Sequence, residues 1–392
     1  MTQVERTQLL IAGGGPVGLF SALCAAKHGL DVIVVERSFR GTPRGHTTLL
    51  HPRSIRLLGE FGLSPLLLRA GQLIEEVKLR VNSGTQRLKL PFPALAITQA
   101  LLEETLLKVL RKEEFDLRGT CEVTALSPFA DRVEVRVARR ERLEAGSYPG
   151  EEHWGLAESG SIHADFVIGA DGRASHVRQA LGIRTVTSGM ERYAMFEFPS
   201  SPPAEPELAI SHELCHLITP LSERRARGSF QLPRGQEWTA DLELLGKLLH
   251  ARAEQQAQPT ELDWSEIMDF EPHVAEQFGR GRVWLAGDAA HRASPLGVQS
   301  MNRGLSEAWE LTSEIAAVAS GKRSLAALEL LGNAQRKDWL QTLAVGPDFE
   351  GSLQAPGWLS GHAAQIVSAL PVSGPDLEDL LRQLGIERRS YA

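Results

Sequence analysis

Three glycines near the start of the chain have the spacing of a nucleotide-binding turn. Gly13, Gly15 and Gly18 form a GxGxxG pattern directly after the apolar residues 9–12, and Glu36 ends the next apolar run. In such a turn the first glycine permits a tight bend, the second lets backbone approach a pyrophosphate, and the third lets the helix pack close to the strand. A carboxylate at the position of Glu36 accepts hydrogen bonds from ribose hydroxyls. The pattern predicts a dinucleotide site and leaves FAD and NAD(P) both open.

Two more acidic residues stand at the ends of short apolar runs. Asp171 follows residues 166–170, and Asp288 follows residues 282–287. Ligands of open α/β sheets bind at the carboxyl ends of the strands, so both carboxylates are expected near the glycine turn. Three distant segments of the chain therefore point to one ligand.

The elements that position these residues follow from the hydrophobic pattern. Residues 9–12 and 31–36 are expected as buried strands joined by a helix over 19–28, and Thr98 as the N-cap of a helix over 99–112. Other helices are expected over 52–61, 238–256, 305–319 and most of the last 60 residues, and other strands over 77–81, 87–90, 133–137, 166–170 and 282–286, with several more over 186–240.

Two segments are expected to interrupt these elements. Pro91-Phe92-Pro93 is expected to break the strand pattern, because proline lacks the N–H that a sheet requires. Residues 139–161 are charged and rich in glycine, and they are expected to form an exposed excursion of a hairpin.

The order of the motifs resembles the class A flavoprotein aromatic hydroxylases, the family typified by para-hydroxybenzoate hydroxylase. The glycine turn is followed by Asp171-Gly172 and then by Gly287-Asp288-Ala289-Ala290-His291, with separations that match. The resemblance covers nearly the whole chain. It implies an α/β protein with a Rossmann-like FAD-binding domain, an inserted, mainly antiparallel β-sheet substrate domain and a helical C-terminal segment. The implied boundaries are 1–71, 99–188 and 263–325 for the FAD-binding domain, 72–98 and 189–262 for the substrate domain, and 326–392 for the C-terminal segment.

The resemblance also implies which residues contact FAD. The glycine turn with Pro16 and Val17 would face the phosphates, Glu36 and Arg37 the adenosine end, and Arg44 would lie in a loop over the cofactor. Gln99 opens a helix that offers a polar side chain, and Asp288 matches an acid that accepts from a ribityl hydroxyl. The implied contacts of the isoalloxazine ring are Pro295, which matches the active-site proline, and Gly297, Val298, Met301 and Asn302.

The chain departs from the family pattern at two positions in the turn beside the ring. The family usually has glycines where this chain has Val298 and Ser300. Glycine permits positive φ and close backbone approach, so a valine is expected to narrow the flavin pocket or to shift the ring.

The reaction implied by the resemblance is an NAD(P)H-driven monooxygenation. NADH or NADPH transiently donates a hydride, O2 forms a flavin C4a-hydroperoxide, and one oxygen atom enters an aromatic or polyketide-like small molecule. Hydroxylation, epoxidation and Baeyer–Villiger insertion stay open, as does the choice between NADH and NADPH. The alternative is a flavin-dependent dehydrogenase or reductase of a hydrophobic molecule without oxygen transfer. A halogenase fits less well, since Trp238 and Trp264 stand alone, and a non-catalytic flavin protein is a further alternative.

Catalytic side chains are hard to assign, since the cofactor carries the chemistry. A phenolic substrate would benefit from a base, and the candidates in the variable unit are Tyr193, His212 and His216, with Pro295 beside the pocket. An ordinary strand role is the alternative for each. The two histidines share a strand face, but no third metal ligand accompanies them, so no metal is expected. His291 is expected to be structural.

Composition excludes several other classes of protein. The 392 residues carry a net charge of −7, so no basic field attracts nucleic acid. The three cysteines lack metal spacing, no apolar run is long enough to span a membrane, and the first strand begins too early for a signal peptide. These features favour a cytoplasmic monomer or homodimer whose partners are small molecules.

Overall fold

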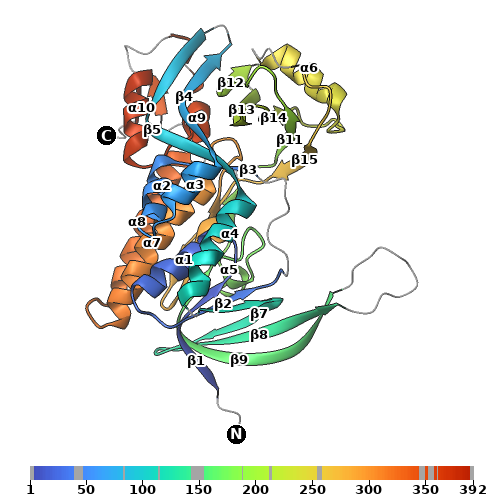
Figure 1. Ribbon diagram of the computed structural model, residues 1–392. Helices are drawn as coiled ribbons and strands as arrows, with labels where there is room; N and C mark the ends of the chain where they lie inside the picture. The colour runs from blue at the N-terminus through green and yellow to red at the C-terminus, as the bar shows by residue number, and fades with distance from the viewer. Residues whose placement is uncertain are drawn as a thin grey trace.

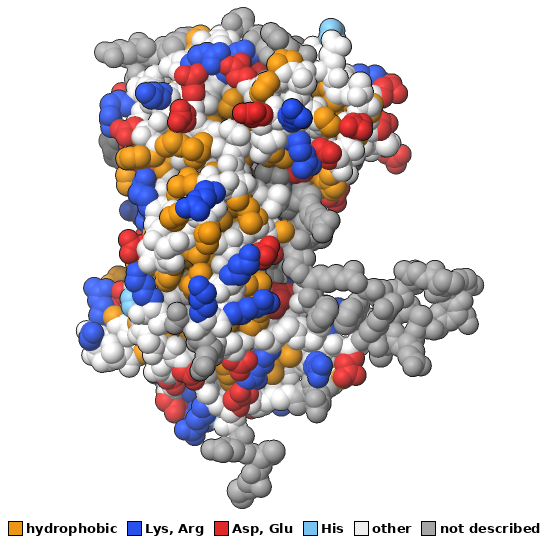
Figure 2. Space-filling model, viewed as in Figure 1, with side chains coloured by type: hydrophobic (Ala, Val, Ile, Leu, Met, Phe, Trp, Pro, Cys, Tyr) orange, Lys and Arg blue, Asp and Glu red, His pale blue; other side chains and the backbone are white. Residues whose placement is uncertain are grey.

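The chain folds into two large sheets joined by a layer of helices (Figure 1). Figure 2 shows Lys and Arg interspersed with Asp and Glu over one face of the molecule. The computed structural model describes residues 4–38, 47–82, 84–113, 115–142, 154–187, 189–211, 214–253, 258–343, 349–351, 357–359 and 361–388.

The glycine turn follows the carboxyl end of a central strand of the first sheet. Strand β1 lies between β2 and β9 and runs parallel to both, so that Leu10 lies beside Ile33 and Val167. Because β18 is also parallel to β9, the carboxyl ends of these strands meet at one edge. The described strands follow the order β17 (Gly279–Arg280), β18 (Val283–Leu285), β9 (Trp154–Gly169), β1 (Glu5–Ala12), β2 (Val32–Glu36) and β6 (Asp116–Gly119), with β7 (Cys121–Pro128) pairing β8 (Val133–Arg142), which pairs β9.

Both faces of this sheet are covered. Leu9 and Ile11 of β1 pack against α1 (Pro16–Lys27), α4 (Gln99–Leu110) and α7 (Gln299–Ala319). Leu10, on the opposite face, packs with Val123 of β7 and Val177 of α5 (His176–Ala180). A strand buried on both faces must be continuously apolar, which explains the sequence of residues 9–12.

Most strands of the second sheet lie within the residue ranges predicted for the substrate unit. Its neighbouring strands are antiparallel, except that β12 runs parallel to β4. Strands β3 and β15 belong to it although they lie outside 72–98 and 189–262. The order of its described strands is β15 (Trp264–Phe270), β11 (Glu191–Pro199), β14 (Arg225–Leu232), β13 (Leu214–Ser222), β12 (Glu207–Ser211), β4 (Gln72–Val81), β5 (Gly84–Thr98) and β3 (Thr47–Leu50).

Alternation along β11 gives this sheet two apolar faces. Phe196 and Phe198 pack under helix α6 (Leu242–Arg252). Tyr193 and Met195 belong to the core on the other side. Side chains in a strand alternate between faces, so the inner face of the sheet can be read directly from the sequence once one residue is placed.

The C-terminal segment is helical, as expected, and belongs to the core. Leu380 and Leu384 of α10 (Pro375–Leu384) pack with Leu88 and Leu90 of β5, and α10 lies beside that strand in Figure 1. The remaining described elements are α2 (Pro52–Gly59), α3 (Ser64–Ala70), α8 (Ala326–Leu343), α9 (Ala363–Ala369), α10 (Pro375–Leu384), β10 (Thr185–Thr187), β16 (His273–Ala275), β19 (His291–Arg292), β20 (Phe349–Gly351), β21 (Ile386–Arg388) and the 3-10 turns Arg111–Glu113, Gly287–Ala289 and Gly357–Leu359.

Several element boundaries differ from the expectations. Residues 91–93 do not end β5; instead the pairing register with β4 shifts there, from Ala94 opposite Ile74 to Lys89 opposite Glu76. Helix α6 begins at Leu242, later than expected, because the carboxylate of Asp241 accepts from the backbone N–H of Leu244 at 2.8 Å and caps it, and the helix ends at Arg252. Helix α7 starts before residue 305. Thr98 does cap α4.

Candidate functional site

The three glycines of the GxGxxG pattern differ in how much space a side chain would find at each position. A Cβ at Gly13, whose φ is +111°, would lie 2.2 Å from the carbonyl oxygen of Ala170. A Cβ at Gly18 would lie 2.0 Å from the carbonyl oxygen of Gly13. At Gly15, by contrast, no atom lies within 4 Å of the Cβ position. The protein's own packing therefore requires the first and third glycines, whereas the second leaves open space for a ligand.

Helix α1 begins at this open space without a side-chain cap. Gly15 is its N-cap residue, no side chain accepts from the first turn, and Pro16 has no N–H. The first N–H groups of a helix have no partner within it, and the helix dipole favours negative charge there. The start of α1 is therefore suited to a phosphate.

Glu36 lies against the turn, as its position at the end of β2 predicts. Its Oε2 accepts from the backbone N–H of Gly14 at 2.5 Å, and its Oε1 accepts from that of Ser38 at 2.6 Å. Each carboxylate oxygen has a second lone pair, so the group can also accept from a ribose hydroxyl.

A cavity, which we name the turn cavity, opens beside Gly15 and Glu36. One oxygen of Asp171 accepts from the backbone N–H of His176 at 2.7 Å, while its buried Oδ1 has no hydrogen-bond partner in the structure. The unsatisfied oxygen and the open space at Gly15 both fit a dinucleotide that carries hydroxyl and phosphate groups. The turn cavity is lined by Ala12, Gly13, Gly15, Val35, Glu36, Arg37, Cys121, Glu122, Val123, Ala170, Asp171, Gly172 and His176.

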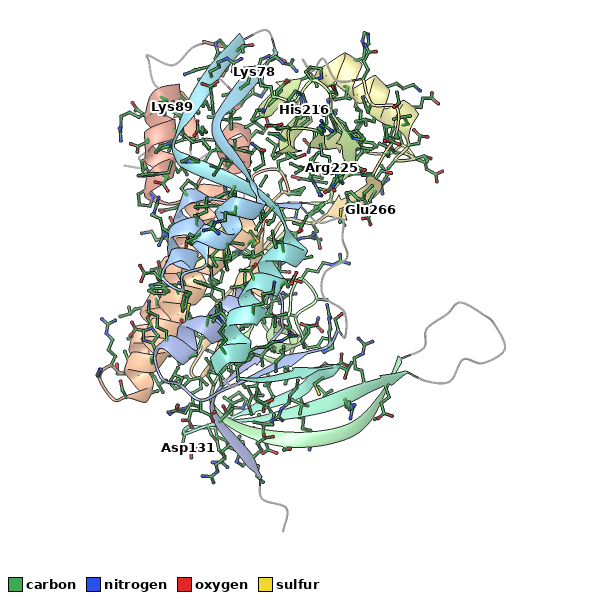
Figure 3. All side chains as sticks on the ribbon, in the orientation of Figure 1. Lys78, Lys89, Asp131, His216, Arg225 and Glu266 are labelled. Atoms are coloured by element: carbon green, nitrogen blue, oxygen red, sulfur yellow. The ribbon has the colours of Figure 1, made fainter. Side chains whose placement is uncertain are left out.

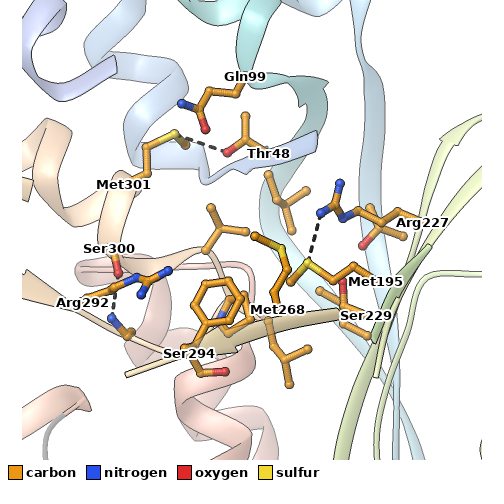
Figure 4. Close-up of a pocket in the computed structure, with 18 of the residues that line it drawn as sticks. Thr48, Gln99, Met195, Arg227, Ser229, Met268, Arg292, Ser294, Ser300 and Met301 are labelled. Atoms are coloured by element: carbon orange, nitrogen blue, oxygen red, sulfur yellow. Dashed lines mark hydrogen bonds between the residues drawn. The ribbon is translucent and has the colours of Figure 1, made fainter. Parts of the chain in front are cut away.

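A second cavity, which we name the loop cavity, lies between the loop before α7 and the inner face of the second sheet (Figure 4). The empty space there, counted together with open solvent at the mouth, is about 970 Å³. The loop cavity is lined by Thr48, Leu49, Gln99, Met195, Leu217, Thr219, Arg227, Ser229, Met268, Phe270, Asp288, Arg292, Ala293, Ser294, Pro295, Leu296, Val298, Ser300 and Met301.

The loop contributes both charge and a strained backbone to the loop cavity. Asp288 follows β18, and its carboxylate lies 3.6 Å from Nε of Arg292. Val298, the N-cap residue of α7, has φ +49° and ψ +35°, in the left-handed region that favours glycine. Ser300 stands at the second position where the family pattern usually has a glycine. Its hydroxyl accepts from the backbone N–H of Ala293 at 2.7 Å, and this hydrogen bond holds the two ends of the loop together.

Asn302 supports this loop from behind and does not line the loop cavity. It is fully buried; its amide donates to the carbonyl oxygens of Leu49 and Val298, and its Oδ1 accepts from the backbone N–H of His51. Burial lowers the pKa of His51 to about 3, so the ring is neutral. We assign its Nε2–H as the donor to the carbonyl oxygen of Gly297 at 2.8 Å.

The C-terminal segment holds the loop from a third side. Gln299 donates to the carbonyl oxygens of Leu370 and Val372 at 2.7 and 3.0 Å. Ser373 lies 3.0 Å from Nδ1 of His51. A Cβ at Gly297 would lie 2.4 Å from the carbonyl oxygen of Ser368, which explains this glycine by packing.

Of the other residues predicted to contact the cofactor, two lie at the loop cavity and one lies outside the described residues. Gln99 and Met301 line the loop cavity, where the Gln99 amide donates to Oε1 of Glu103 at 2.8 Å and Sδ of Met301 accepts from the Thr48 hydroxyl at 3.3 Å. Arg44 lies outside the described residues.

Two of the proposed bases, Tyr193 and His216, do not line the loop cavity. His216 is fully buried, stacks on Phe230 and lies 3.3 Å from Glu207, within the second sheet (Figure 3). Leu217 faces the loop cavity, so alternation sends His216 to the opposite face. Tyr193 is buried behind the cavity wall. His212 lies outside the described residues.

The sequence analysis did not identify Arg227, the charged side chain that the second sheet contributes to the loop cavity. Arg227 of β14 donates from Nη1 to Oε1 of Glu197 at 2.8 Å, and its guanidinium carbon lies 5.1 Å from the ring centre of Trp264. Figure 4 shows it beside Met195. Burial lowers the pKa of Arg227, and the charge of Glu197 opposes this. Successive side chains of a strand point to opposite faces of the sheet, so the sequence places Arg227 on one face of its strand. It does not say which of the two faces lines the cavity.

Two further observations concern the described residues alone. No group of three His, Cys, Asp or Glu side chains there is placed to hold a metal ion. None of the described helices combines the length and apolarity that crossing a membrane needs.

Comparisons with known proteins agree with this geometry. A family model described as an FAD binding domain matches residues 6–337. The chain is 26% identical over 385 residues to the rifampicin monooxygenase of Streptomyces venezuelae, covering 88% of this chain and 74% of that protein. It is 25% identical over 340 residues to the 6-methylpretetramide 4-monooxygenase of Streptomyces rimosus, covering 81% of this chain but only 57% of that relative.

A solved structure gives the same fold over nearly the whole chain. The p-nitrophenol 4-monooxygenase of Pseudomonas putida superposes with a TM-score of 0.74 at 19% identity, covering 97% of this chain and 95% of that one. At this identity the likeness concerns the fold. It confirms the expected α/β architecture, a Rossmann-like FAD-binding fold with an inserted, mainly antiparallel sheet and a helical C-terminal segment.

Proposed function

This chain belongs to the FAD-binding domain family, and from that premise we propose that it is an FAD-dependent monooxygenase. It would use NADH or NADPH and O2 to insert one oxygen atom into an aromatic or polyketide-like molecule. The single observation that carries the proposal is the loop cavity, because one wall is the loop expected beside the flavin and the other is the inner face of the second sheet. The names of two relatives support the reaction class.

FAD, when bound, supplies the redox chemistry and the activation of O2. We assign the phosphates to the open space at Gly15 and the start of α1. We assign the adenosine ribose to Glu36, and a further hydroxyl to the unsatisfied oxygen of Asp171. These residues bind and orient the cofactor and take no part in the chemistry.

We assign the ring end of FAD to the loop before α7. Asp288 would accept from a ribityl hydroxyl, and Pro295 and Val298 would contact the ring. Backbone N–H groups at the start of α7 would stabilise the negative charge of the reduced ring without a lysine. The hydrogen bonds of Asn302 and Gln299 hold that helix start in place before the ligand arrives.

The second sheet would provide the substrate wall. Met195, Met268 and Phe270 give it a largely apolar surface that excludes water, which otherwise wastes activated oxygen as peroxide. Arg227 is the buried cation of this wall, and it would orient a substrate through an oxygen that accepts hydrogen bonds. The wall therefore combines an apolar surface with one directional polar contact.

One observation favours the second candidate, a flavin dehydrogenase or reductase. Val298 places a branched side chain in the loop cavity at positive φ, where it limits the room for a ring and an oxygenated substrate. The same binding residues would then pass a hydride between NAD(P)H and a hydrophobic molecule without oxygen transfer.

The test is to incubate FAD-loaded protein with NADH or NADPH and a panel of phenols and polyketide-like aromatics. Monooxygenation predicts a substrate-stimulated oxidation of the nicotinamide and a product heavier by one oxygen atom. Oxidation of the nicotinamide with no oxygen in any organic product would favour the second candidate. No reaction with any compound of the panel would reject both for these substrate classes.

The location and assembly of the chain stay predictions. A cytoplasmic location agrees with Cys24, Cys121 and Cys215, none of which forms a disulfide bond among the described residues. Gel filtration would separate a monomer from a homodimer.

A further inference from the structure

Three of the five methionines in the chain line the loop cavity. Met195 of β11 and Met268 of β15 belong to neighbouring strands of the second sheet, whereas Met301 belongs to α7 (Figure 4). A thioether is flexible and polarisable, so these side chains give the cavity an adaptable apolar wall. Each sulfur also carries lone pairs that an oxidant can attack. The wall therefore gathers oxidisable groups around the place assigned to the reaction.

The three sulfur atoms differ in their hydrogen bonds. Sδ of Met195 accepts from Nη2 of Arg227 at 3.3 Å, and Sδ of Met301 accepts from the Thr48 hydroxyl at 3.3 Å. No donor from the described part of the chain reaches Sδ of Met268. A donor occupies a lone pair of the sulfur and draws electron density from it, which makes the sulfur a weaker nucleophile. Met268 therefore has the most reactive sulfur of the loop cavity.

A fourth methionine differs from these three in its access to solvent. Met190 is 48% exposed and does not line the loop cavity, whereas Met268 is partly buried against the core of the second sheet. An oxidant that arrives from solvent meets Met190 first. An oxidant that is released inside the cavity meets Met268 first. The order in which these two residues react therefore reports where the oxidant comes from.

We propose that Met268 is a self-oxidation site, converted to methionine sulfoxide by hydrogen peroxide that the loop cavity releases when activated oxygen is not passed to a substrate. This inference rests on the proposed function, which supplies the peroxide by reducing O2 with NAD(P)H. The sulfoxide replaces an apolar side chain of the substrate wall by a polar one. The modified cavity therefore binds aromatic molecules more weakly, and the enzyme loses activity.

Atoms and electrons balance in this oxidation. A lone pair of the Met268 sulfur bonds to one oxygen of hydrogen peroxide as the O–O bond breaks. The proton on that oxygen moves to the departing hydroxide, which leaves as water. The sulfur is oxidised by two electrons, and the peroxide is reduced by the same two.

The site of oxidation can be read by mass spectrometry, because each of the five methionines lies in a different tryptic peptide. FAD-loaded protein is incubated in air with NADH or NADPH and no substrate, and catalase destroys any peroxide that reaches the solvent. The peptide that contains Met268 is expected to become heavier by one oxygen atom, while the peptide of Met190 stays unmodified. Met195 and Met301 are expected to react roughly 2–10-fold more slowly, since each loses a hydrogen bond when its sulfur is attacked.

A second experiment tests the reactivity of the sulfur atoms without turnover. Hydrogen peroxide is added to the FAD-loaded protein with neither nicotinamide nor catalase. It is expected to oxidise Met190 first, and then Met268 before Met195 and Met301. Thr48→Val removes the donor to Met301 and nearly keeps the shape of the side chain, so oxidation of Met301 should become roughly 2–10-fold faster.

Met268→Leu tests the consequence of the modification. Leucine keeps an apolar side chain of similar volume but has no sulfur. During turnover without substrate, the wild type is expected to lose its substrate-stimulated oxidation of the nicotinamide, and methionine sulfoxide reductases are expected to restore it. Met268→Leu should keep its own initial rate. Met190→Leu is the matched control, and it should lose activity as fast as the wild type does.

The outcomes separate the self-oxidation site from the proposed function. Consumption of the nicotinamide with Met268 unmodified, oxidation of another methionine ahead of it in the presence of catalase, or equal inactivation of Met268→Leu overturns the site, and an oxygenated product still supports the proposed function. Oxidation of Met268 while no compound of the panel gains oxygen supports the site, and the proposed function then fails alone. A protein that consumes no nicotinamide rejects the proposed function, and the site fails with it because no peroxide is made.

Discussion

Substituting Gly15 by alanine should strongly weaken FAD binding while leaving the apoprotein folded. Gly15 has φ −73° and ψ 179°, which alanine adopts freely, and nothing lies within 4 Å of the added methyl group. Stability should rise by about 0.4–1 kcal/mol, because alanine restricts the unfolded chain. The methyl group occupies the space assigned to the phosphates, however. Losing two charge-assisted hydrogen bonds at about 1.5–3 kcal/mol each weakens FAD by about 3–6 kcal/mol, roughly 10²–10⁴-fold.

The assay combines thermal unfolding of the apoprotein with titration of FAD by fluorescence quenching. Gly29→Ala is the matched control, since Gly29 also has no neighbour within 4 Å but has φ +74°. That variant should lose about 1 kcal/mol of stability and keep its FAD affinity. Unchanged FAD affinity in Gly15→Ala, or an apoprotein that unfolds much more easily, would refute the assignment of the phosphates to this space.

Four further predictions follow from the same structure. Glu36→Ala should weaken FAD by about 1–3 kcal/mol in the same titration, and an unchanged Kd would reject the ribose contact. Asp288→Ala should lower the flavin content after gel filtration; full retention would contradict its role. Val298→Gly should raise the stability of the apoprotein by about 1 kcal/mol, because it relieves the strain of a positive φ. It should also tighten FAD, because the branched side chain leaves the loop cavity, so weaker binding would count against a narrowed pocket. The pKa of Glu207, which burial alone would raise, is held at about 2 by hydrogen bonds from His216 and Arg80. Because this lies below its unfolded value, about 3 kcal/mol of stability should be present above pH about 4.5 and be lost as the pH falls toward 2. Chemical unfolding at several pH values checks this, and an equal loss in Glu207→Gln would exclude the pair as the cause.

The nucleotide end of the site could be predicted because its determinants are local. One strand, one turn and one helix in the first 36 residues contain Gly13, Gly15, Gly18 and Glu36, and each role follows from chain geometry. The acids at 171 and 288 were predictable because parallel strands deliver their carboxyl ends to one edge. Only short-range patterns and the rules of strand order are needed for these inferences.

The walls of the loop cavity could not be predicted in the same way. Arg227 and Ser294 line the same cavity although they belong to elements far apart in the chain, and alternation alone does not say which strand face is inner. His216 looked like a base but faces away, since its neighbour Leu217 takes the cavity side. Asn302 has the motif position of a cofactor contact, yet its amide is fully used in bonding to the loop. Side-chain function there depends on tertiary packing that no local pattern encodes.

Labelled dioxygen tests the central claim most directly. FAD-loaded protein, NADH or NADPH and an accepted aromatic substrate are incubated under ¹⁸O₂ in unlabelled water, and the product is weighed by mass spectrometry. The proposed function predicts that one labelled oxygen atom enters each product molecule. Product without the label, or hydrogen peroxide as the sole oxygen product while the nicotinamide is consumed, would contradict it.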